Sequence, residues 1–289
     1  ISNQAIILMI KSDYNRKIIS QEAVDLCPLC SSNKQLFLYK DFEESRFVKC
    51  ESCDLVYQNP RYEIGYEEEY WGKAIDPDGN ERDLITEREL KIKNLYADDI
   101  KFVEKQSGGK ILDAGCGFGF FLSALSDRWE KYGLELSEYC VDFIKKNNPN
   151  IKVKDEIIEN IPFDLEFFNV IYSFHVIEHV KNPIKHVECL HKMLKKGGTL
   201  VISTPNIDSF VSRMFKGNYR LLGLPHIILF SVDTLSMLLN KVGFEIIDIK
   251  FPFFKTEYFT FNNLLRLCNK KSVSPPFYGN IMTFYTRKV

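Results

Sequence analysis

The stretch Ile111-Leu-Asp-Ala-Gly-Cys-Gly-Phe-Gly-Phe-Phe-Leu122 decides the fold class of this chain. It reads as the end of a strand, a glycine turn and the start of a helix, because apolar residues flank three alternating glycines, Gly115, Gly117 and Gly119. Such a turn lets the backbone approach a ligand closely and directs its free N–H groups at that ligand. The stretch therefore predicts an α/β fold that binds a ligand at this turn.

Two acidic residues narrow the class of ligand. Asp113 precedes the first glycine, and Glu135 follows in the next strand pattern, twenty residues after Gly115. An acid at that place accepts hydrogen bonds from both hydroxyls of a ribose. A dinucleotide fold has the pattern G-x-G-x-x-G, but Phe120 takes the place of its last glycine here. The pattern found is D-x-G-x-G-x-G.

This spacing resembles motif I of the class I S-adenosylmethionine-dependent methyltransferases. The resemblance continues through Glu135, residues 174–180 and residues 194–206, and it covers roughly residues 106 to 289. It implies a seven-stranded Rossmann-like α/β sheet in which residues 245–251 and 281–286 form an edge hairpin with the seventh strand antiparallel. It also implies S-adenosylmethionine as cofactor. The cofactor-binding residues carried over are Asp113, Gly115, Cys116, Gly117, Gly119, Glu135, Leu136, Ile158, Phe174 and His175.

The sequence departs from the family pattern at the adenine end of the cofactor. Many relatives have an aspartate five residues before a proline, where it reaches the adenine amino group, but Ile157 occupies that place here. Adenine contact is therefore expected from backbone near Ile158 and Glu159, or from Asp155. Within motif I, the side chain of Cys116 is expected to be a small packing group.

Two histidines are candidates for a catalytic base. An alcohol acceptor needs a base near neutral pH, for which a histidine is suited. By resemblance, Glu178 and His179 stand between cofactor and acceptor. Residues 225–231 resemble the P-H-x-x-x-F-S element of small-molecule methyltransferases related to the ubiquinone O-methyltransferases, which would place His226 over the acceptor pocket. We predict His179 or His226 as the base, and we expect two other histidines, His186 and His191, to be solvated surface residues.

Four cysteines near the beginning of the sequence have the spacing of a metal site. Cys27 and Cys30 form C-x2-C, nineteen residues follow, and Cys50 and Cys53 form a second C-x2-C. Thiolates select zinc, and a tetrahedral four-sulfur set leaves no open position for chemistry, so one structural zinc is expected. Two disulfides would need an oxidising compartment, and a redox pair would occur once, ahead of a helix. The segment resembles a zinc ribbon and is similar to ribbons fused ahead of bacterial methyltransferases.

Three regions follow from these patterns. Residues 1–62 are predicted to hold an amino-terminal segment and the zinc ribbon, residues 63–105 a helical connector, and residues 106–289 the methyltransferase domain. Tyr70 and Trp71 in the connector are an aromatic pair that either packs on the domain or covers the cofactor. Two substrate insertions are expected, the locally basic residues 206–230 and the aromatic-rich residues 251–280, the latter as a lid or a dimer surface.

Composition and charge limit the class of partner. The chain has 289 residues, 45% hydrophobic and 27% charged, and no segment approaches the ~20 apolar residues of a membrane helix. The apolar run at residues 5–10 does not make a convincing signal peptide. Residues 1–62 carry eight basic against eight acidic side chains, without the basic excess of a protein that neutralises many phosphates. We expect a cytoplasmic monomer or homodimer with a small-molecule substrate, and neither a membrane nor a nucleic-acid partner is favoured.

The leading functional hypothesis is methyl transfer from S-adenosylmethionine to a small acceptor, at a hydroxyl of a sugar or a nucleotide-linked metabolite. One alternative is an RNA base methyltransferase that uses the zinc ribbon to bind RNA. Another is a non-catalytic S-adenosylmethionine-binding partner protein, which the intact glycine motif and Glu135 disfavour.

Overall fold

The computed structural model of this chain describes residues 16–66, 73–75, 81–91 and 94–289. Three features named above lie outside these residues: the aromatic pair Tyr70 and Trp71, the apolar run at residues 5–10, and part of the connector. Their predicted roles are therefore untested by the structure.

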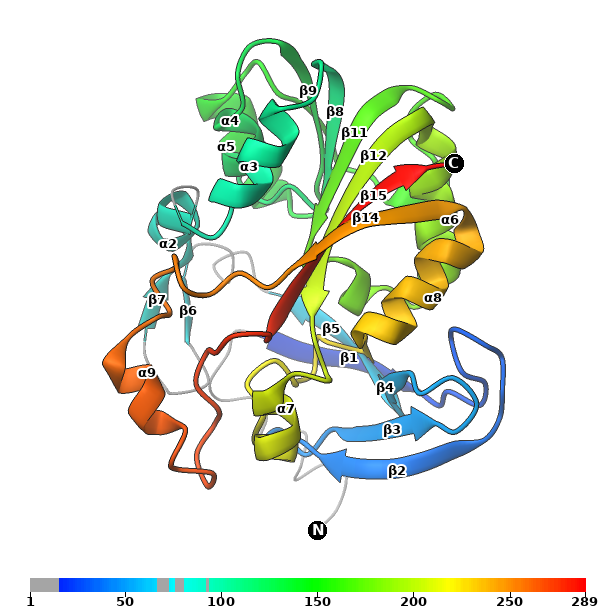
Figure 1. Cartoon of the computed structure of the whole chain (residues 1–289), viewed down its shortest axis with the longest axis vertical. Helices are drawn as coiled ribbons and strands as arrows, with labels where there is room; N and C mark the ends of the chain where they lie inside the picture. The colour runs from blue at the N-terminus through cyan, green and yellow to red at the C-terminus, as the bar shows by residue number, and fades with distance from the viewer. Residues whose placement is uncertain (1–15, 67–72, 76–80, 92–93) are drawn as a thin grey trace.

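Seven strands form the central sheet, in the order β10-β9-β8-β11-β12-β15-β14 (Figure 1). Neighbouring strands are parallel except at β15, which is antiparallel to both β12 and β14. The predicted fold class is confirmed, including the edge hairpin with an antiparallel last strand. In chain order the strands are β8 (Gly109–Ala114), β9 (Trp129–Leu134), β10 (Lys152–Lys154), β11 (Phe168–Phe174), β12 (Leu194–Pro205), β14 (Phe244–Lys250) and β15 (Ile281–Lys288).

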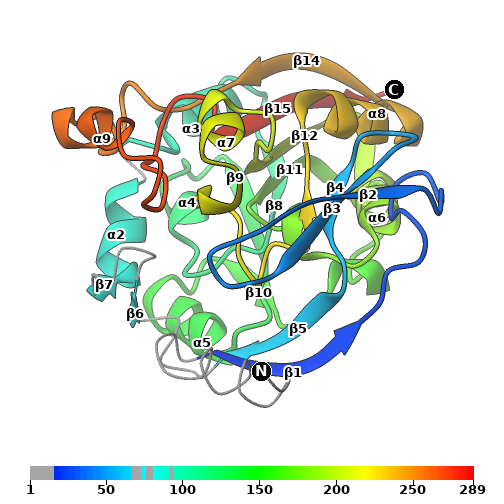
Figure 2. The same ribbon diagram turned by 90° about the horizontal axis from the view of Figure 1, so that it is seen from below.

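Helices cover both faces of this sheet. Figures 1 and 2 show α3, α4 and α5 on one face and α6 and α8 on the other. Capping residues mark where these helices begin and end. The Ser137 side chain accepts a hydrogen bond from the Cys140 N–H at the start of α5, and the Asn182 side chain accepts one from the Lys185 N–H at the start of α6. Gly243, with a φ angle of +100°, ends α8. Their bounds are α3 (Ala97–Glu104), α4 (Phe120–Ser123), α5 (Glu138–Asn147), α6 (Pro183–Met193) and α8 (Val232–Val242).

A second, four-stranded sheet lies below the carboxyl ends of the central strands and has the order β13-β4-β3-β2 (Figure 1). Three of its strands, β2 (Gln35–Lys40), β3 (Arg46–Cys50) and β4 (Val56–Gln58), come from the predicted zinc ribbon. The fourth, β13 (Ile228–Leu229), comes from the predicted substrate insertion and pairs antiparallel with β4. The ribbon sheet is therefore completed by a strand from far along the chain.

Apolar packing extends the contact between the ribbon and residues 206–230. Phe47 and Val56 of the ribbon belong to one buried cluster with Val211, Phe215 and Tyr219. These last residues belong to α7 (Phe210–Phe215) and the loop after η4 (Lys216–Asn218), and α7 lies next to β3 in Figure 1. A Cβ added at Gly217 would lie 2.1 Å from the Lys40 carbonyl oxygen, so the two backbones meet without space for a side chain. Part of the insertion is thus used to hold the ribbon.

Residues 63–105 are predicted as a helical connector, and their described part contains strands as well as helices. This part begins in β5 (Arg61–Tyr66), which pairs antiparallel with β1 (Arg16–Glu22). A short hairpin follows, made by β6 (Lys73–Ile75) and β7 (Glu81–Asp83), and only then come α2 (Leu84–Lys91) and α3. The strand β5 forms because β1 supplies a hydrogen-bonding partner, and such a distant partner leaves no signal in local sequence.

Residues 251–280 carry the aromatic crossover and the helix α9 (Phe261–Arg266). Phe253 is buried at its centre, with ring centroids of Phe254, Phe259 and Phe277 between 5.2 and 5.5 Å away. Whether this crossover is a lid or a dimer surface stays a prediction. Among the described residues, no helix is long and apolar enough to cross a membrane.

Candidate active site

The glycine turn after β8 has the conformation that its sequence predicts. Gly115, Gly117 and Gly119 have φ angles of +84°, +53° and +74°, in the left-handed region that favours glycine. A Cβ on Gly115 would lie 2.4 Å from a methyl carbon of Val176, so the turn lies directly against the segment that follows β11. The backbone therefore runs at the carboxyl edge of the sheet, where open α/β folds bind ligands.

Glu135 lies beside this turn, immediately after β9. Its Oε2 accepts a hydrogen bond from the Gly117 N–H at 2.8 Å, and its Oε1 accepts one from the Ser137 N–H at 2.9 Å. Two backbone donors thus fix the carboxylate while its other lone pairs stay available to hydroxyl groups. The next residue, Leu136, is 61% exposed and offers an apolar surface at the same edge.

Asp113 and Cys116 are both buried. Burial raises the pKa of Asp113 well above its ordinary value, and the nearby charge of Glu135 raises it further. The Cys116 sulfur lies only 2.7 Å from where a Cβ on Gly133 would be, so the thiol packs against β9. This agrees with the expected packing role of the Cys116 side chain.

The adenine end also has a defined geometry. Ile158 is buried in η2 (Ile158–Asn160), while Ile157 before it is exposed. The carboxylate of Glu159 is held by His186, whose Nδ1 lies 2.9 Å from its Oε1. The side chain of Glu159 is therefore engaged, and backbone near Ile158 or the exposed Asp155 remains the predicted adenine contact.

A buried carboxylate lies behind the carboxyl end of β11. Phe174 ends this strand, and His175 follows with φ +56°, an unusual conformation for a non-glycine residue. His175 Nδ1 lies 2.7 Å from Oε1 of Glu178, which belongs to η3 (Ile177–His179) and is fully buried. Thr204 donates to its Oε2 at 3.0 Å. Burial raises the pKa of Glu178, but the charge and hydrogen bond of His175 outweigh it and leave the pKa below its ordinary value.

The two histidines predicted as alternatives lie together. The ring centroids of His179 and His226 are 4.9 Å apart, and one ligand atom from each lies within 4.8 Å of a Glu178 oxygen. His179 Nδ1 lies 2.8 Å from the Pro225 carbonyl oxygen, and His226 Nδ1 lies 2.7 Å from that of Leu221. Because a carbonyl only accepts, each Nδ1 carries a hydrogen, and whenever the ring is neutral its Nε2 keeps a lone pair.

The protonation of His226 follows from its surroundings. Burial lowers its pKa to about 4, and repulsion from His179 acts in the same direction. The imidazole is therefore neutral near pH 7. A neutral ring with a free Nε2 lone pair is able to accept a proton.

One expectation about the remaining histidines is wrong. His186, predicted to be solvated, is only 1% exposed because α6 packs against η2 and α8. His191 is half-buried: its ring lies 5.1 Å from that of Phe244, and its Nε2 is enclosed without a hydrogen-bond partner among the described residues. Periodicity along α6 could not show that its outer positions are covered by distant segments.

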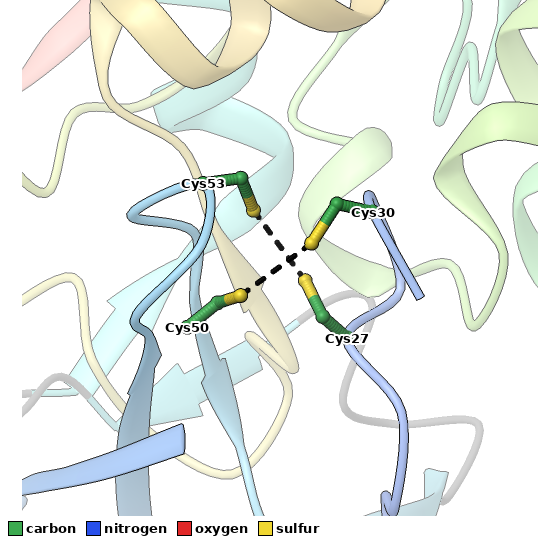
Figure 3. A group of neighbouring side chains, drawn as sticks. All are labelled: Cys27, Cys30, Cys50 and Cys53. Atoms are coloured by element: carbon green, nitrogen blue, oxygen red, sulfur yellow. Dashed lines mark hydrogen bonds between the residues drawn. The ribbon is translucent and has the colours of Figure 1, made fainter. Parts of the chain in front are cut away.

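The four ribbon cysteines converge on one point (Figure 3). The sulfurs of Cys27 and Cys53 are 3.6 Å apart, those of Cys30 and Cys50 are 3.5 Å apart, and all four lie within 4.8 Å of one another. A tetrahedral zinc site with Zn–S bonds of about 2.3 Å would place its sulfurs roughly 3.8 Å apart. A disulfide would need two sulfurs about 2.05 Å apart. The donor set therefore fits a four-coordinate soft metal ion.

The thiols of this cluster differ in how readily they lose a proton. Burial raises the pKa of the Cys27 thiol to about 11, so this thiol is protonated near pH 7 unless a cation is bound. At Cys50, burial is outweighed by hydrogen bonds, which lower its pKa to about 7. The Ser52 N–H donates to Cys50 Sγ at 3.4 Å, an arrangement that supports a thiolate. A divalent ion would thus displace protons as it binds.

Two residues that sequence reasoning did not select connect the ribbon to the histidine pair. The Gln58 side chain donates to the Gly223 and Leu224 carbonyls at 3.1 and 3.3 Å. Glu43 accepts from the Leu224 N–H at 2.9 Å. No local pattern marks either residue, because both partners are more than 160 positions away along the chain.

Comparisons with known proteins agree with this geometry. The family described as Methyltransferase domain matches residues 88–249. A probable S-adenosylmethionine-dependent methyltransferase of Mycolicibacterium smegmatis is 26% identical over 149 residues, covering 51% of this chain and 56% of that protein. The ubiquinone biosynthesis O-methyltransferase of Coxiella burnetii is 30% identical over 115 residues, or 37% and 49% of the two chains. The chain spans about half the length of these curated relatives.

Other relatives and solved structures extend the comparison. The tRNA U34 carboxymethyltransferase of Saccharophagus degradans is 28% identical over 156 residues, covering 47% of this chain and 45% of that protein. A crystal structure of an S-adenosylmethionine-dependent methyltransferase from Thermotoga maritima superposes with a TM-score of 0.51 at 22% identity, covering 71% of this chain and 96% of that one. A chain from the Haloferax volcanii complex of the Trm112 activator with a putative methyltransferase superposes with a TM-score of 0.54 at 12% identity, covering 70% of this chain and 93% of that chain. At these identities the structures show a shared fold.

Proposed function

This chain belongs to the methyltransferase domain family, and on that premise we propose that it transfers a methyl group from S-adenosylmethionine to a small acceptor. The proposed acceptor atom is a hydroxyl oxygen of a sugar or a nucleotide-linked metabolite. The observation that carries the proposal is the pair His179 and His226 at the sheet edge that holds the glycine turn, each with an Nε2 that has no hydrogen-bond partner among the described residues.

The residues around the turn would bind and orient the cofactor. Its sulfonium supplies a methyl group that is electrophilic without further activation. The Glu135 carboxylate, held by Gly117 and Ser137, would accept hydrogen bonds from the ribose hydroxyls. Phe174 and His175 at the end of β11 would line the same pocket, and the exposed Leu136 would contact the adenine ring. These contacts leave alignment of the acceptor and removal of its proton to the rest of the site.

The histidine pair would remove the proton of the acceptor hydroxyl. The neutral His226 has a lone pair on Nε2, and His179 offers a second one nearby. Once either ring accepts the proton, the buried carboxylate of Glu178 would stabilise its positive charge. The site thus contains a base and a counter-charge, which an alcohol acceptor requires and a more nucleophilic acceptor does not.

The zinc ribbon would serve a structural role. The four cysteines Cys27, Cys30, Cys50 and Cys53 offer four sulfurs and no open coordination position, so we propose one structural zinc per chain. The similarity to a tRNA-modifying enzyme keeps RNA as the second candidate acceptor. The equal numbers of basic and acidic residues in residues 1–62 favour the small acceptor.

The acceptor is tested by incubating the protein with methyl-labelled S-adenosylmethionine and either a panel of nucleotide sugars or bulk RNA. We expect label in one or more nucleotide sugars. Label that enters RNA alone would establish the second candidate instead. The absence of label from both pools, with intact cofactor binding by calorimetry, would support the non-catalytic alternative.

The variants His226→Asn and His179→Asn identify the base. An asparagine amide nitrogen replaces the imidazole Nδ1, so each variant keeps the hydrogen bond to the Leu221 or Pro225 carbonyl but loses the lone pair at Nε2. We expect the variant of the true base to lose about 100-fold or more in kcat, with the cofactor Kd unchanged by calorimetry. Full turnover in both variants would exclude both residues as the base.

The pH profile separates the two histidines further. A base acts only when it is neutral, and burial lowers the pKa of His226 to about 4. If His226 is the base, kcat is expected to stay level as the pH falls from about 8 to about 6 and to decrease only toward pH 4. A decline of kcat that already begins between about pH 8 and pH 6 would contradict a base with a pKa of about 4 and would therefore rule out His226.

A further inference from the structure

Residues 221–228, here named the bridging segment, lie between the zinc ribbon and the histidine pair. On the ribbon side, the Gln58 amide donates to two of its carbonyls, those of Gly223 and Leu224, at 3.1 and 3.3 Å. Glu43 accepts from the Leu224 N–H at 2.9 Å, and the Gln58 backbone N–H donates to the Ile227 carbonyl at 2.9 Å. Four hydrogen bonds from two ribbon residues thus fix the position of this segment.

On its other side, the same segment holds the catalytic candidates. Its Pro225 carbonyl accepts from His179 Nδ1, and its Leu221 carbonyl accepts from His226 Nδ1. The Ile227 N–H donates to the backbone carbonyl of Glu178 at 2.9 Å. The orientation and tautomer of both imidazoles therefore depend on where the carbonyls of the bridging segment lie.

Burial makes the ribbon contacts hard to replace. Gln58 is 0% exposed, and Leu224 and Ile227 are buried as well. Water cannot reach the Gly223 and Leu224 carbonyls to substitute for a lost amide donor without opening the contact between ribbon and insertion. Glu43 is positioned by the loop of residues 41–45, in which Asp41 Oδ1 accepts from the backbone N–H groups of Glu43 and Ser45.

We propose that Gln58 and Glu43 are positioning residues for the histidine pair, and that the zinc ribbon is therefore a structural part of the acceptor site. The inference rests on the proposed function for its catalytic meaning, but its geometric content is independent of the acceptor. Cys50 ends β3 and Cys53 lies in the turn that leads to β4, the strand that ends at Gln58, so the proposed metal site is tied to the same strand.

Matched variants test the two ribbon residues. Gln58→Met keeps a similar volume but removes both amide donors, and Glu43→Leu removes the acceptor of the Leu224 N–H. Glu43→Gln keeps an amide oxygen able to accept that hydrogen bond, so its effect should be smaller than that of Glu43→Leu. Lys34→Ala changes an exposed residue of the ribbon and serves as the unchanged control.

The primary readout is the imidazole NMR spectrum of ¹⁵N-histidine-labelled protein, which contains five histidines. We expect Gln58→Met and Glu43→Leu to shift the His179 and His226 resonances and to leave those of His186 and His191 in place. Turnover of the small acceptor should fall about tenfold or more in kcat, since misplaced catalytic groups lose that much or more. The cofactor Kd and the zinc content should stay as in the wild type.

The outcomes separate this proposal from the proposed function. The positioning role would be overturned if the His179 and His226 resonances do not shift in a folded Gln58→Met variant. It would also be overturned if Lys34→Ala shifts these resonances as much as Gln58→Met does. If Gln58→Met does not fold, the comparison of Glu43→Leu with Glu43→Gln decides, and equal spectra for those two would overturn it. If the wild type methylates no small acceptor, the proposed function fails, while the resonance shifts still support or refute the positioning role.

Discussion

Cys53→Ser is expected to lower the free energy of unfolding by about 4 kcal/mol or more, because it removes one of four proposed zinc ligands. Cys53 is buried and its sulfur faces that of Cys27, so no solvent ligand replaces it readily. The measurement is urea unfolding followed by circular dichroism, together with the zinc content per chain. The control is Cys268→Ser, since Cys268 is exposed and lies outside the cluster.

The loss of stability in Cys53→Ser should extend beyond the ribbon. β4 pairs with β13, and Phe47 and Val56 share a buried cluster with residues 211–219, so release of the ribbon exposes apolar surface on residues 206–230. We therefore expect one cooperative transition at a lower urea concentration. A metal-free protein with the stability of the zinc-loaded form would contradict the structural role of the metal.

Glu135→Ala is expected to weaken S-adenosylmethionine binding by about 100-fold or more. Two hydrogen bonds from ribose hydroxyls to a carboxylate contribute about 1.5–3 kcal/mol each, and each 1.4 kcal/mol corresponds to a factor of ten in Kd. The variant also leaves the Gly117 and Ser137 N–H groups without their present acceptor, which loosens the turn itself. Isothermal titration calorimetry with the cofactor measures the effect.

Glu138→Ala is the matched control for this measurement. Glu138 is an exposed acid in the first turn of α5, three residues after Glu135, and it makes no contact with the glycine turn among the described hydrogen bonds. The Kd of Glu138→Ala for S-adenosylmethionine should stay close to that of the wild type. If Glu135→Ala binds the cofactor as tightly as Glu138→Ala does, the cofactor assignment at this edge is wrong.

Local features of the chain were determined by the sequence alone. The left-handed conformations of Gly115, Gly117 and Gly119, the proximity of Glu135 to their turn, and the convergence of the four cysteines all depend on short-range spacing. Ser137 and Asn182 begin their helices and Gly243 ends its helix because of capping interactions within a few residues. The seven-stranded sheet with its antiparallel last strand was expected from the family resemblance that the glycine motif carries, and the structure supplied the strand order.

Only the tertiary structure decided how the distant parts meet. The pairing of β13 with β4, the proximity of His179 to His226, the burial of His186 and the strand character of β5 each join segments far apart in the sequence. Such contacts depend on which surfaces the folded sheet brings together, and neither periodicity nor spacing along the chain encodes that geometry. For this reason the ribbon was predicted as a separate amino-terminal unit, whereas in the fold Gln58 and Glu43 hold the segment on which both candidate bases depend.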